Sequence, residues 1–245
     1  MAVALAASAV LSGCGGGGSD KKPRLAVSAA SSLTQALTSC SSAFADAKVR
    51  LEFGGSDELA ARIRQGAKPD VYAAANTKLP QALHEEGRLD KPRVFANNEL
   101  VLAIPQRSSK VHSLSDVGKP GLKIAVGSPS VPVGSYTAQA LSRLPARDQQ
   151  GIEANIRSKE PDVKGVVGKL TQGAVDAGFV YATDVRATAG KLVAVELPAR
   201  LEPTVAYGAG VVRKTAHLAA ARKYVQGLVS GACEAALHKA GFGSP

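Results

Sequence analysis

Predicted strands and helices alternate along the chain from Arg24 onward, and this alternation limits the fold more than any other feature of the sequence. Apolar residues recur at helical spacing, as Leu59 and Ile63 do, and Gly66 is suited to end that helix. In this first part, strands are predicted at 24–28, 49–53 and 70–74, and helices at 31–45, 56–65 and 76–86. Such alternation predicts an α/β fold with a largely parallel sheet.

The second part of the chain continues this alternation after a change of rhythm that follows the strand at 100–105. Further strands are predicted at 122–127, 177–181, 192–196 and 205–212, and helices at 134–144, 164–171, 216–229 and 233–240. The strand at 205–212 is expected to return to the first part of the fold. A chain of 245 residues is long for one simple core, and two interwoven lobes suit it better.

Three segments place small or hydroxyl residues where a strand ends and a helix begins: SAASSL at 28–33, FGGSDEL at 53–59 and PSVPVGSY at 129–136. A helix N-terminus presents free backbone N–H groups and the positive end of the helix dipole. Ligands of open α/β sheets bind beyond the carboxyl ends of the strands. Each segment alone is adequately read as a capped helix. Together, aimed into one cleft, the three predict an oxyanion site without a charged side chain.

The sequence offers little for catalysis. No G-x-S-x-G nucleophile motif occurs, and His84, His112, His217 and His238 are dispersed without metal-ligand spacing. The glycine run at 15–18 is not a phosphate-binding loop, because no strand precedes it and no GK[ST] follows it. We therefore expect a binding protein and not an enzyme, with no cofactor and no side chain that ligates a metal directly.

The formal net charge of +10 raises the question of nucleic-acid binding. The basic residues are scattered, with no dense cluster beyond Lys21-Lys22, and the chain contains no Trp and only 4% aromatic residues. Stacking platforms for bases are therefore scarce. The sequence favours a generally basic surface, which would also raise the encounter rate of an anionic ligand.

The N-terminus has the pattern of an exported lipoprotein. An apolar stretch too short to span a membrane leads into LSGC at 11–14, and a Gly-Ser stretch follows. LSGC resembles the site at which bacterial lipoproteins are cut and lipidated. We expect a signal peptide at 1–13, then lipidated Cys14 and a flexible tether at 14–23. No Lys or Arg precedes the apolar stretch, so a start further upstream is one hypothesis, and a buried N-terminal helix is the alternative.

Cys40 and Cys233 are the two other cysteines, and both occupy apolar positions of predicted helices. They form no CxxC motif, which argues against a metal or thioredoxin-like site. Two alternatives stay open for an oxidising compartment: a disulfide, or two buried free thiols.

From Arg24 to Pro245 the chain carries a collinear set of motifs: AASSL at 29–33, FGGSDELA at 53–60, GAKPDVYA at 66–73, NELV at 98–101, GSPSVPVG at 127–134 and GFVYATD at 178–184. In this order they resemble the periplasmic molybdate-binding proteins of ABC importers, the ModA family. The resemblance implies a two-lobed periplasmic solute-binding fold of type II. Each lobe would hold a mixed, mainly parallel sheet flanked by helices, and hinge strands would cross between them. Lobe 1 would comprise 24–100 and 206–245, and lobe 2 would comprise 101–205.

The resemblance also implies the ligands of the oxyanion. Ser32 and Ser56 match two serine positions of the family, and Tyr181 matches a tyrosine whose hydroxyl reaches the anion. Val133 and Val163 match positions that donate a backbone N–H. Such a shell offers chiefly donors and no charged acceptor, so it prefers a fully deprotonated tetrahedral dianion over an anion that still carries a proton.

We therefore predict capture of molybdate, and of tungstate, for an ABC importer. The expected partners are the oxyanion and a membrane permease, with no nucleic acid and a lipid as the sole membrane attachment. A monomer at the outer face of the cytoplasmic membrane or in the periplasm is expected. The alternatives are another oxyanion such as sulfate, a lipid-anchored sensory or scaffold module, and an enzyme on a similar two-lobed fold.

Overall fold

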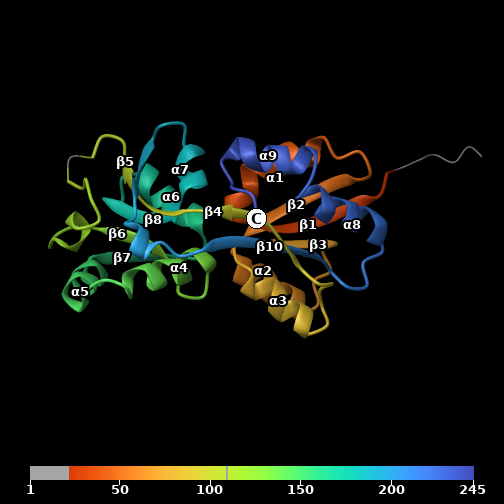
Figure 1. Ribbon diagram of the computed structural model, residues 1–245, viewed down its shortest axis with the longest axis horizontal. Helices are drawn as coiled ribbons and strands as arrows, with labels where there is room; N and C mark the ends of the chain where they lie inside the picture. The colour runs from red at the N-terminus through yellow and green to blue at the C-terminus, as the bar shows by residue number, and fades with distance from the viewer. Residues whose placement is uncertain (1–21, 109) are drawn as a thin grey trace, which may run out of the picture.

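The computed structural model describes residues 22–108 and 110–245. Two lobes lie side by side along the long axis, each built around one five-stranded sheet with helices on both faces (Figure 1). The two-lobed α/β fold predicted from the sequence is therefore confirmed. The predicted signal peptide, Cys14 and the tether as far as residue 21 lie outside the described residues.

The first lobe contains a sheet with the strand order β2-β1-β3-β10-β4. Its strands are β1 (Arg24–Ala30), β2 (Lys48–Gly54), β3 (Val71–Ala74), β4 (Arg93–Asn98) and β10 (Val205–Val211). Strand β1 runs parallel to β2 and β3, whereas β10 runs antiparallel to β3 and β4. The carboxyl ends of β1, β2 and β3 therefore meet at one edge of the sheet.

Five helices and one 3₁₀ turn complete this lobe: η1 (Ser31–Leu33), α1 (Thr34–Ser42), α2 (Ser56–Arg64), α3 (Lys78–Glu85), α8 (Leu218–Gly227) and α9 (Ala232–Ala240). Helices α1, α8 and α9 cover one face of the sheet, and α2 and α3 cover the other (Figure 1). Alternate residues of β3 supply the two faces: Val71 and Ala73 pack into one apolar cluster, and Tyr72 and Ala74 into the other.

The second lobe contains a sheet with the strand order β7-β6-β8-β5-β9. Its strands are β5 (Leu100–Pro105), β6 (Ile124–Gly127), β7 (Ile156–Glu160), β8 (Ala177–Tyr181) and β9 (Leu192–Glu196). Its helices are α4 (Pro132–Leu141), α5 (Ala146–Ala154), α6 (Val163–Thr171) and α7 (Ala182–Arg186), with 3₁₀ turns η2 (Asp116–Gly118) and η3 (Ala199–Leu201). Strand β6 runs parallel to β7 and β8, so the carboxyl ends of these strands also share an edge.

The chain crosses between the lobes twice. Strand β4 ends in the first sheet at Asn98, and β5 begins in the second sheet at Leu100. The return runs from Glu196 at the end of β9 to Val205 at the start of β10. Lobe 1 is thus built from two separate segments of the chain, and lobe 2 is inserted between them.

Both sheets are mixed, as predicted, but antiparallel pairs are as numerous as parallel ones among the described strands. The expectation of mainly parallel sheets is wrong in this respect. The reason is the crossing itself, because β4, β5 and β10 carry the chain between the sheets and run against their neighbours.

Cys40 of α1 and Cys233 of α9 form a disulfide, with their Cα atoms 4.7 Å apart. The structure therefore has the first of the two alternatives left open for these cysteines. The bond joins the two separate segments of lobe 1 across one face of its sheet. Within residues 22–108 and 110–245, no helix is long and apolar enough to cross a membrane.

Candidate functional site

A small cavity lies between the lobes, where the parallel strands of both sheets end. It is lined by Ala30, Ser31, Ser32, Gly54, Gly55, Ser56 and Ala75 from lobe 1 and by Val131, Pro132, Val133, Asp162, Val163 and Tyr181 from lobe 2. All five ligands predicted from the sequence are in this set. They are also deeply buried, from 1% exposed for Tyr181 to 7% for Ser32. The structure therefore brings together residues that lie up to 149 positions apart.

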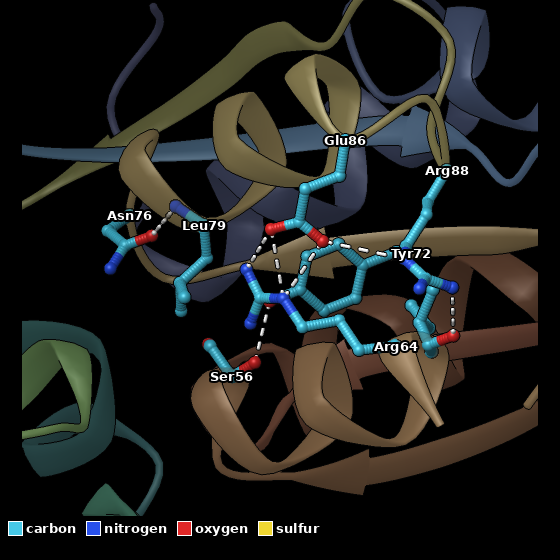
Figure 2. Close-up of polar contacts among 8 residues, drawn as sticks. Ser56, Arg64, Tyr72, Asn76, Leu79, Glu86 and Arg88 are labelled. Atoms are coloured by element: carbon cyan, nitrogen blue, oxygen red, sulfur yellow. Dashed lines mark hydrogen bonds and ion pairs between the residues drawn. The ribbon is translucent and has the colours of Figure 1, made fainter. Parts of the chain in front are cut away.

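Ser56 stands at the first turn of α2 and is held from two sides. Its Oγ accepts a hydrogen bond from the N–H of Ala75 at 3.1 Å. Figure 2 shows the second contact, in which the backbone carbonyl of Ser56 accepts a hydrogen bond from the Tyr72 hydroxyl at 2.6 Å. Because Oγ already accepts the Ala75 N–H, the Ser56 hydroxyl proton is left to donate elsewhere. The side chain lines the cavity, so this proton is available to an anion there.

Two helix N-termini of lobe 2 face the same cavity. In α4, the first backbone bond runs from the N–H of Ser135 to the carbonyl of Val131 at 2.9 Å, so the N–H of Val133 lies ahead of the helical ladder. Gly134 allows this approach, because a Cβ there would stand 2.0 Å from the carbonyl oxygen of Ser128. The N-terminus of α4 is thereby packed tightly against the end of β6.

The N-terminus of α6 is arranged differently. The Asp162 carboxylate caps it by accepting a hydrogen bond from the N–H of Gly165 at 3.0 Å. The N–H of Val163 lies in the first turn and has no partner within the helix. Asp162 therefore complements the helix dipole, and Val163 retains a backbone donor beside the cavity.

Tyr181 ends β8 and carries the most unusual group of the site. Its hydroxyl is buried and has no hydrogen-bond partner anywhere in the described chain. Buried polar groups nearly always have a partner, so an orphan hydroxyl at a cavity points to a water or an ion bound there. Burial raises the pKa of Tyr181 well above its usual value, and the neighbouring hydroxyl of Tyr207 adds to this. The Tyr181 hydroxyl is therefore a neutral hydrogen-bond donor at any physiological pH.

Among the described residues, no cationic side chain lines the cavity. The nearest candidate in the sequence is Lys164, next to Val163, but its Nζ pairs with the buried carboxylate of Asp184 at 2.9 Å. Burial raises the pKa of Asp184, and the Lys164 ammonium opposes that shift. Across residues 22–108 and 110–245, no group of three or more His, Cys, Asp or Glu side chains is placed to hold a metal ion. Apart from the Asp162 carboxylate, the site thus offers neutral donors and helix dipoles.

The family model for bacterial extracellular solute-binding proteins matches residues 25–243. The molybdate-binding protein ModA of Mycobacterium tuberculosis (strain H37Rv) is 34% identical over 227 residues, which cover 90% of this chain and 85% of that protein. The chain belongs to the ModA family of solute-binding proteins. This is a family of transport proteins and not of enzymes.

Two solved structures have the same two-lobed fold as this ModA-family chain. The periplasmic molybdate-binding protein of Azotobacter vinelandii has a TM-score of 0.80 at 23% identity, over 90% of this chain and 99% of that one. The sulfate-binding protein SubI of Mycobacterium tuberculosis has a TM-score of 0.76 at 18% identity, over 90% of this chain and 86% of that one.

A larger cavity of about 590 Å³ lies elsewhere in this ModA-family protein, at η2, α5 and η3 of lobe 2. None of the five predicted ligands lines it. By contrast, the cavity between the lobes leaves only about 20 Å³ for the centre of a water-sized sphere. Pockets for drug-sized organic ligands measure roughly 300–1,000 Å³. The site between the lobes is therefore far too small for an organic ligand of that size.

Sequence reasoning missed the residues that support Ser32. The Ser32 Oγ lies 2.9 Å from the hydroxyl of Tyr207, and the Asn98 side-chain amide donates to that hydroxyl at 3.3 Å. Asn98 stands at the first crossing and Tyr207 on β10. Asn98 begins the NELV motif, but nothing in the spacing relates it to Tyr207, because the two positions meet only when the crossing strands pair.

Proposed function

We propose that this protein captures molybdate, and also tungstate, outside the cytoplasmic membrane and delivers it to an ABC permease. The observation that carries the proposal is the Tyr181 hydroxyl, which is buried at the cavity without a partner. A tetrahedral oxyanion held between the lobes would accept its hydrogen bond. The same anion would accept hydrogen bonds from Ser32 and Ser56 and from the backbone N–H groups of Val133 and Val163.

The chemistry of the wall supports a fully deprotonated oxyanion. Hydroxyls and free amides at helix N-termini stabilise negative charge without a counter-charge. The one carboxylate at the wall, Asp162, uses one of its oxygens to cap α6, so it serves the helix as well as lining the cavity. The small cavity supports an inorganic ion over an organic solute.

The relatives support the identity of the ion. The Mycobacterium tuberculosis relative and the Azotobacter vinelandii structure are both named as molybdate-binding proteins. Sulfate is the second candidate, because the sulfate-binding protein SubI shares the fold and sulfate is also a fully deprotonated dianion. The two ions differ in size, which makes selectivity between them a question of cavity dimensions.

The proposal includes the place and state of the protein. We infer a monomer anchored to the outer face of the cytoplasmic membrane, or in the periplasm, by a lipid on Cys14, with the chain to residue 23 as tether. The extracellular solute-binding family supports the location, and the LSGC segment supports the anchor. We also infer that the protein binds its ligand without converting it and needs no cofactor.

The test is a ligand panel on the protein from residue 20 to 245, with molybdate, tungstate, sulfate and phosphate, read by thermal unfolding. A ligand at about 100 times its dissociation constant stabilises the folded state by roughly 2.7 kcal/mol. Stabilisation by molybdate and tungstate alone is expected. Stabilisation by sulfate in preference to molybdate would make this a sulfate receptor, and no response to any of the four would overturn the proposal.

Site variants test the assignment of ligands. Each of Ser32→Ala, Ser56→Ala and Tyr181→Phe removes one hydrogen bond to a charged group, which weakens binding by about 1–3 kcal/mol. Tyr181→Phe is the sharpest of the three, because in the described chain its hydroxyl makes no hydrogen bond to protein that the change would break. Unchanged molybdate affinity in all three variants would refute the site.

A further inference from the structure

The direction of one hydrogen bond decides what the cavity offers to a ligand. Ser32 Oγ and the Tyr207 hydroxyl lie 2.9 Å apart, and both side chains are buried. Distance alone allows either oxygen to donate. If Ser32 donates to Tyr207, it presents a lone pair to the cavity. If Tyr207 donates to Ser32, the Ser32 proton is left for the cavity.

Asn98 settles this direction. Its side-chain Oδ1 accepts a hydrogen bond from the N–H of Glu99 at 2.9 Å, which fixes the orientation of the amide. The Nδ2 group then donates to Thr183 Oγ1 at 2.9 Å and to the Tyr207 hydroxyl at 3.3 Å. An amide nitrogen has only donors, so the oxygen of Tyr207 must accept.

The Tyr207 proton consequently needs an acceptor. Its side chain is 0% exposed, and Ser32 Oγ is the acceptor within reach among the hydrogen bonds of the described chain. Burial raises the pKa of Tyr207 well above its usual value, with the charge of Asp184 adding to the effect, so the proton stays on Tyr207. Tyr207 therefore donates to Ser32.

The resulting chain of hydrogen bonds runs in one direction, from the Asn98 amide to Tyr207, from Tyr207 to Ser32, and from Ser32 into the cavity. Ser56 is set in the same sense, because its Oγ accepts the N–H of Ala75. Both serines thus donate to the site. Asn98 also donates a hydrogen bond to Thr183 of lobe 2, so this series of hydrogen bonds begins at the crossing between the lobes.

We propose that Asn98 and Tyr207 are positioning residues that hold Ser32 as a hydrogen-bond donor, and that this makes the site reject oxyanions that still carry a proton. The inference rests on the proposed function and extends it to selectivity. The P–OH group of a protonated anion such as hydrogen phosphate finds no acceptor at Ser32, because the Ser32 proton points to the same place. Molybdate, tungstate and sulfate carry no proton at neutral pH and meet a matched donor.

The test reverses the direction of these hydrogen bonds. Asn98→Asp replaces the donor nitrogen with a carboxylate oxygen of the same shape, so Tyr207 donates to this new oxygen, Ser32 donates to Tyr207, and a Ser32 lone pair faces the cavity. The new negative charge weakens the binding of every dianion, so the quantity to compare is the ratio of two dissociation constants. Dissociation constants for molybdate and for phosphate are measured by calorimetry at pH 8. We expect the phosphate-to-molybdate ratio to fall at least about tenfold, the equivalent of one hydrogen bond.

Tyr207→Phe gives a second, uncharged test. It frees Ser32 to accept, so the same ratio should fall, while a purely structural role would weaken both ions alike. Tyr224→Phe is the matched control, because the Tyr224 hydroxyl also lies 2.9 Å from a serine oxygen, that of Ser41, and neither residue lines the cavity. Its ratio should stay that of the unchanged protein.

The outcomes separate the two levels of the argument. If the unchanged protein binds none of molybdate, tungstate or sulfate, the proposed function itself fails. If it binds molybdate but the ratio is the same in Asn98→Asp, Tyr207→Phe and Tyr224→Phe, the positioning role is overturned. Thermal unfolding of each variant verifies that it is folded, and Tyr207→Phe carries the test alone if Asn98→Asp does not fold.

Discussion

Replacing Gly55 with alanine should hold the two lobes apart. Gly55 precedes α2 in lobe 1, and a Cβ built on it would stand 2.6 Å from the carbonyl oxygen of Pro161 in lobe 2. Its backbone angles, φ −63° and ψ 132°, are open to any residue. The need for glycine therefore arises from the contact between lobes and not from backbone strain. At the neighbouring Gly54 a Cβ would make only ordinary contact, 3.6 Å from Leu59.

The size of the effect follows from the distance. Ordinary van der Waals contact begins at 3.4 Å, so the Pro161 carbonyl must retreat by 0.8 Å. A hydrogen bond of about 2.8 Å stretched by that amount is lost. An anion held by Ser56 of lobe 1 would then lose at least one donor from lobe 2. Each such bond to a charged group contributes about 1.5–3 kcal/mol, which corresponds to a roughly 10- to 160-fold weaker affinity.

The stability of the ligand-free protein should change little. Alanine caps a helix less well than glycine, which lowers the free energy of unfolding by up to about 1 kcal/mol. Alanine also restricts the unfolded chain, which raises the free energy of unfolding by about 0.4–1 kcal/mol. Gly55→Ala should therefore lower affinity without lowering the free energy of unfolding. Gly168→Ala is the matched control, because a Cβ at Gly168 in α6 meets nothing within 4 Å.

The assay combines molybdate calorimetry with small-angle X-ray scattering. The unchanged protein and Gly168→Ala should bind alike and become more compact with ligand, whereas Gly55→Ala should bind weakly and stay more open. The reasoning is refuted if Gly55→Ala binds molybdate within threefold of the unchanged protein and compacts to the same degree.

Three further predictions concern stability. Replacing Cys40 and Cys233 together with serine should lower the free energy of unfolding by about 2–5 kcal/mol in urea titrations, with molybdate affinity unchanged. Lys164→Met should destabilise the protein by about 3 kcal/mol at pH 8, the low end for a broken buried pair because Lys164 is partly exposed, since it leaves the buried Asp184 carboxylate without its cation. Burial raises the pKa of Asp184, and loss of the Lys164 ammonium raises it further, so this deficit in unfolding free energy should shrink as the pH falls and the carboxyl takes up a proton. Burial raises the pKa of Tyr224 to about 12, above the value of about 10 in an unfolded chain. The contribution of Tyr224 to the free energy of unfolding is therefore complete below pH 10 and is lost between pH 10 and 12. Denaturant titrations at pH 9 and 11 should show this loss, and Tyr224→Phe should reduce it.

Much of the fold could be predicted because local patterns and tertiary structure agree. Strand β3 is an uninterrupted apolar run, and all four of its residues are buried. Strand β7 was not predicted, because it lies at the sheet edge and alternates half-buried residues with charged ones such as Arg157 and Lys159. Strand β4 was missed for a related reason, since Arg93 and Val94 at its start are exposed. Helix α7 is only one turn long, too short to show helical periodicity.

The predicted site residues came from a resemblance, and the cavity shows why local patterns could not have replaced it. Helix starts at Ser56 and near Val133 follow predicted strand ends in the sequence, whereas Val163 was obtained from the resemblance alone. The helix predicted from residue 31 begins instead with the 3₁₀ turn η1, and in the described chain no side chain caps this turn. Tyr181 has no local signal at all, because its importance arises from an unpartnered hydroxyl that appears only when the lobes meet.

The disulfide gives the folded chain a property that its sequence order conceals. Cys40 and Cys233 are 193 positions apart, and the whole of lobe 2 lies on the loop that they close. A protease that cuts once anywhere on that loop, outside the membrane where such enzymes are common, leaves two fragments that are still one covalent molecule. The nicked protein would keep its full mass on a non-reducing gel, and only a reductant would reveal the cut.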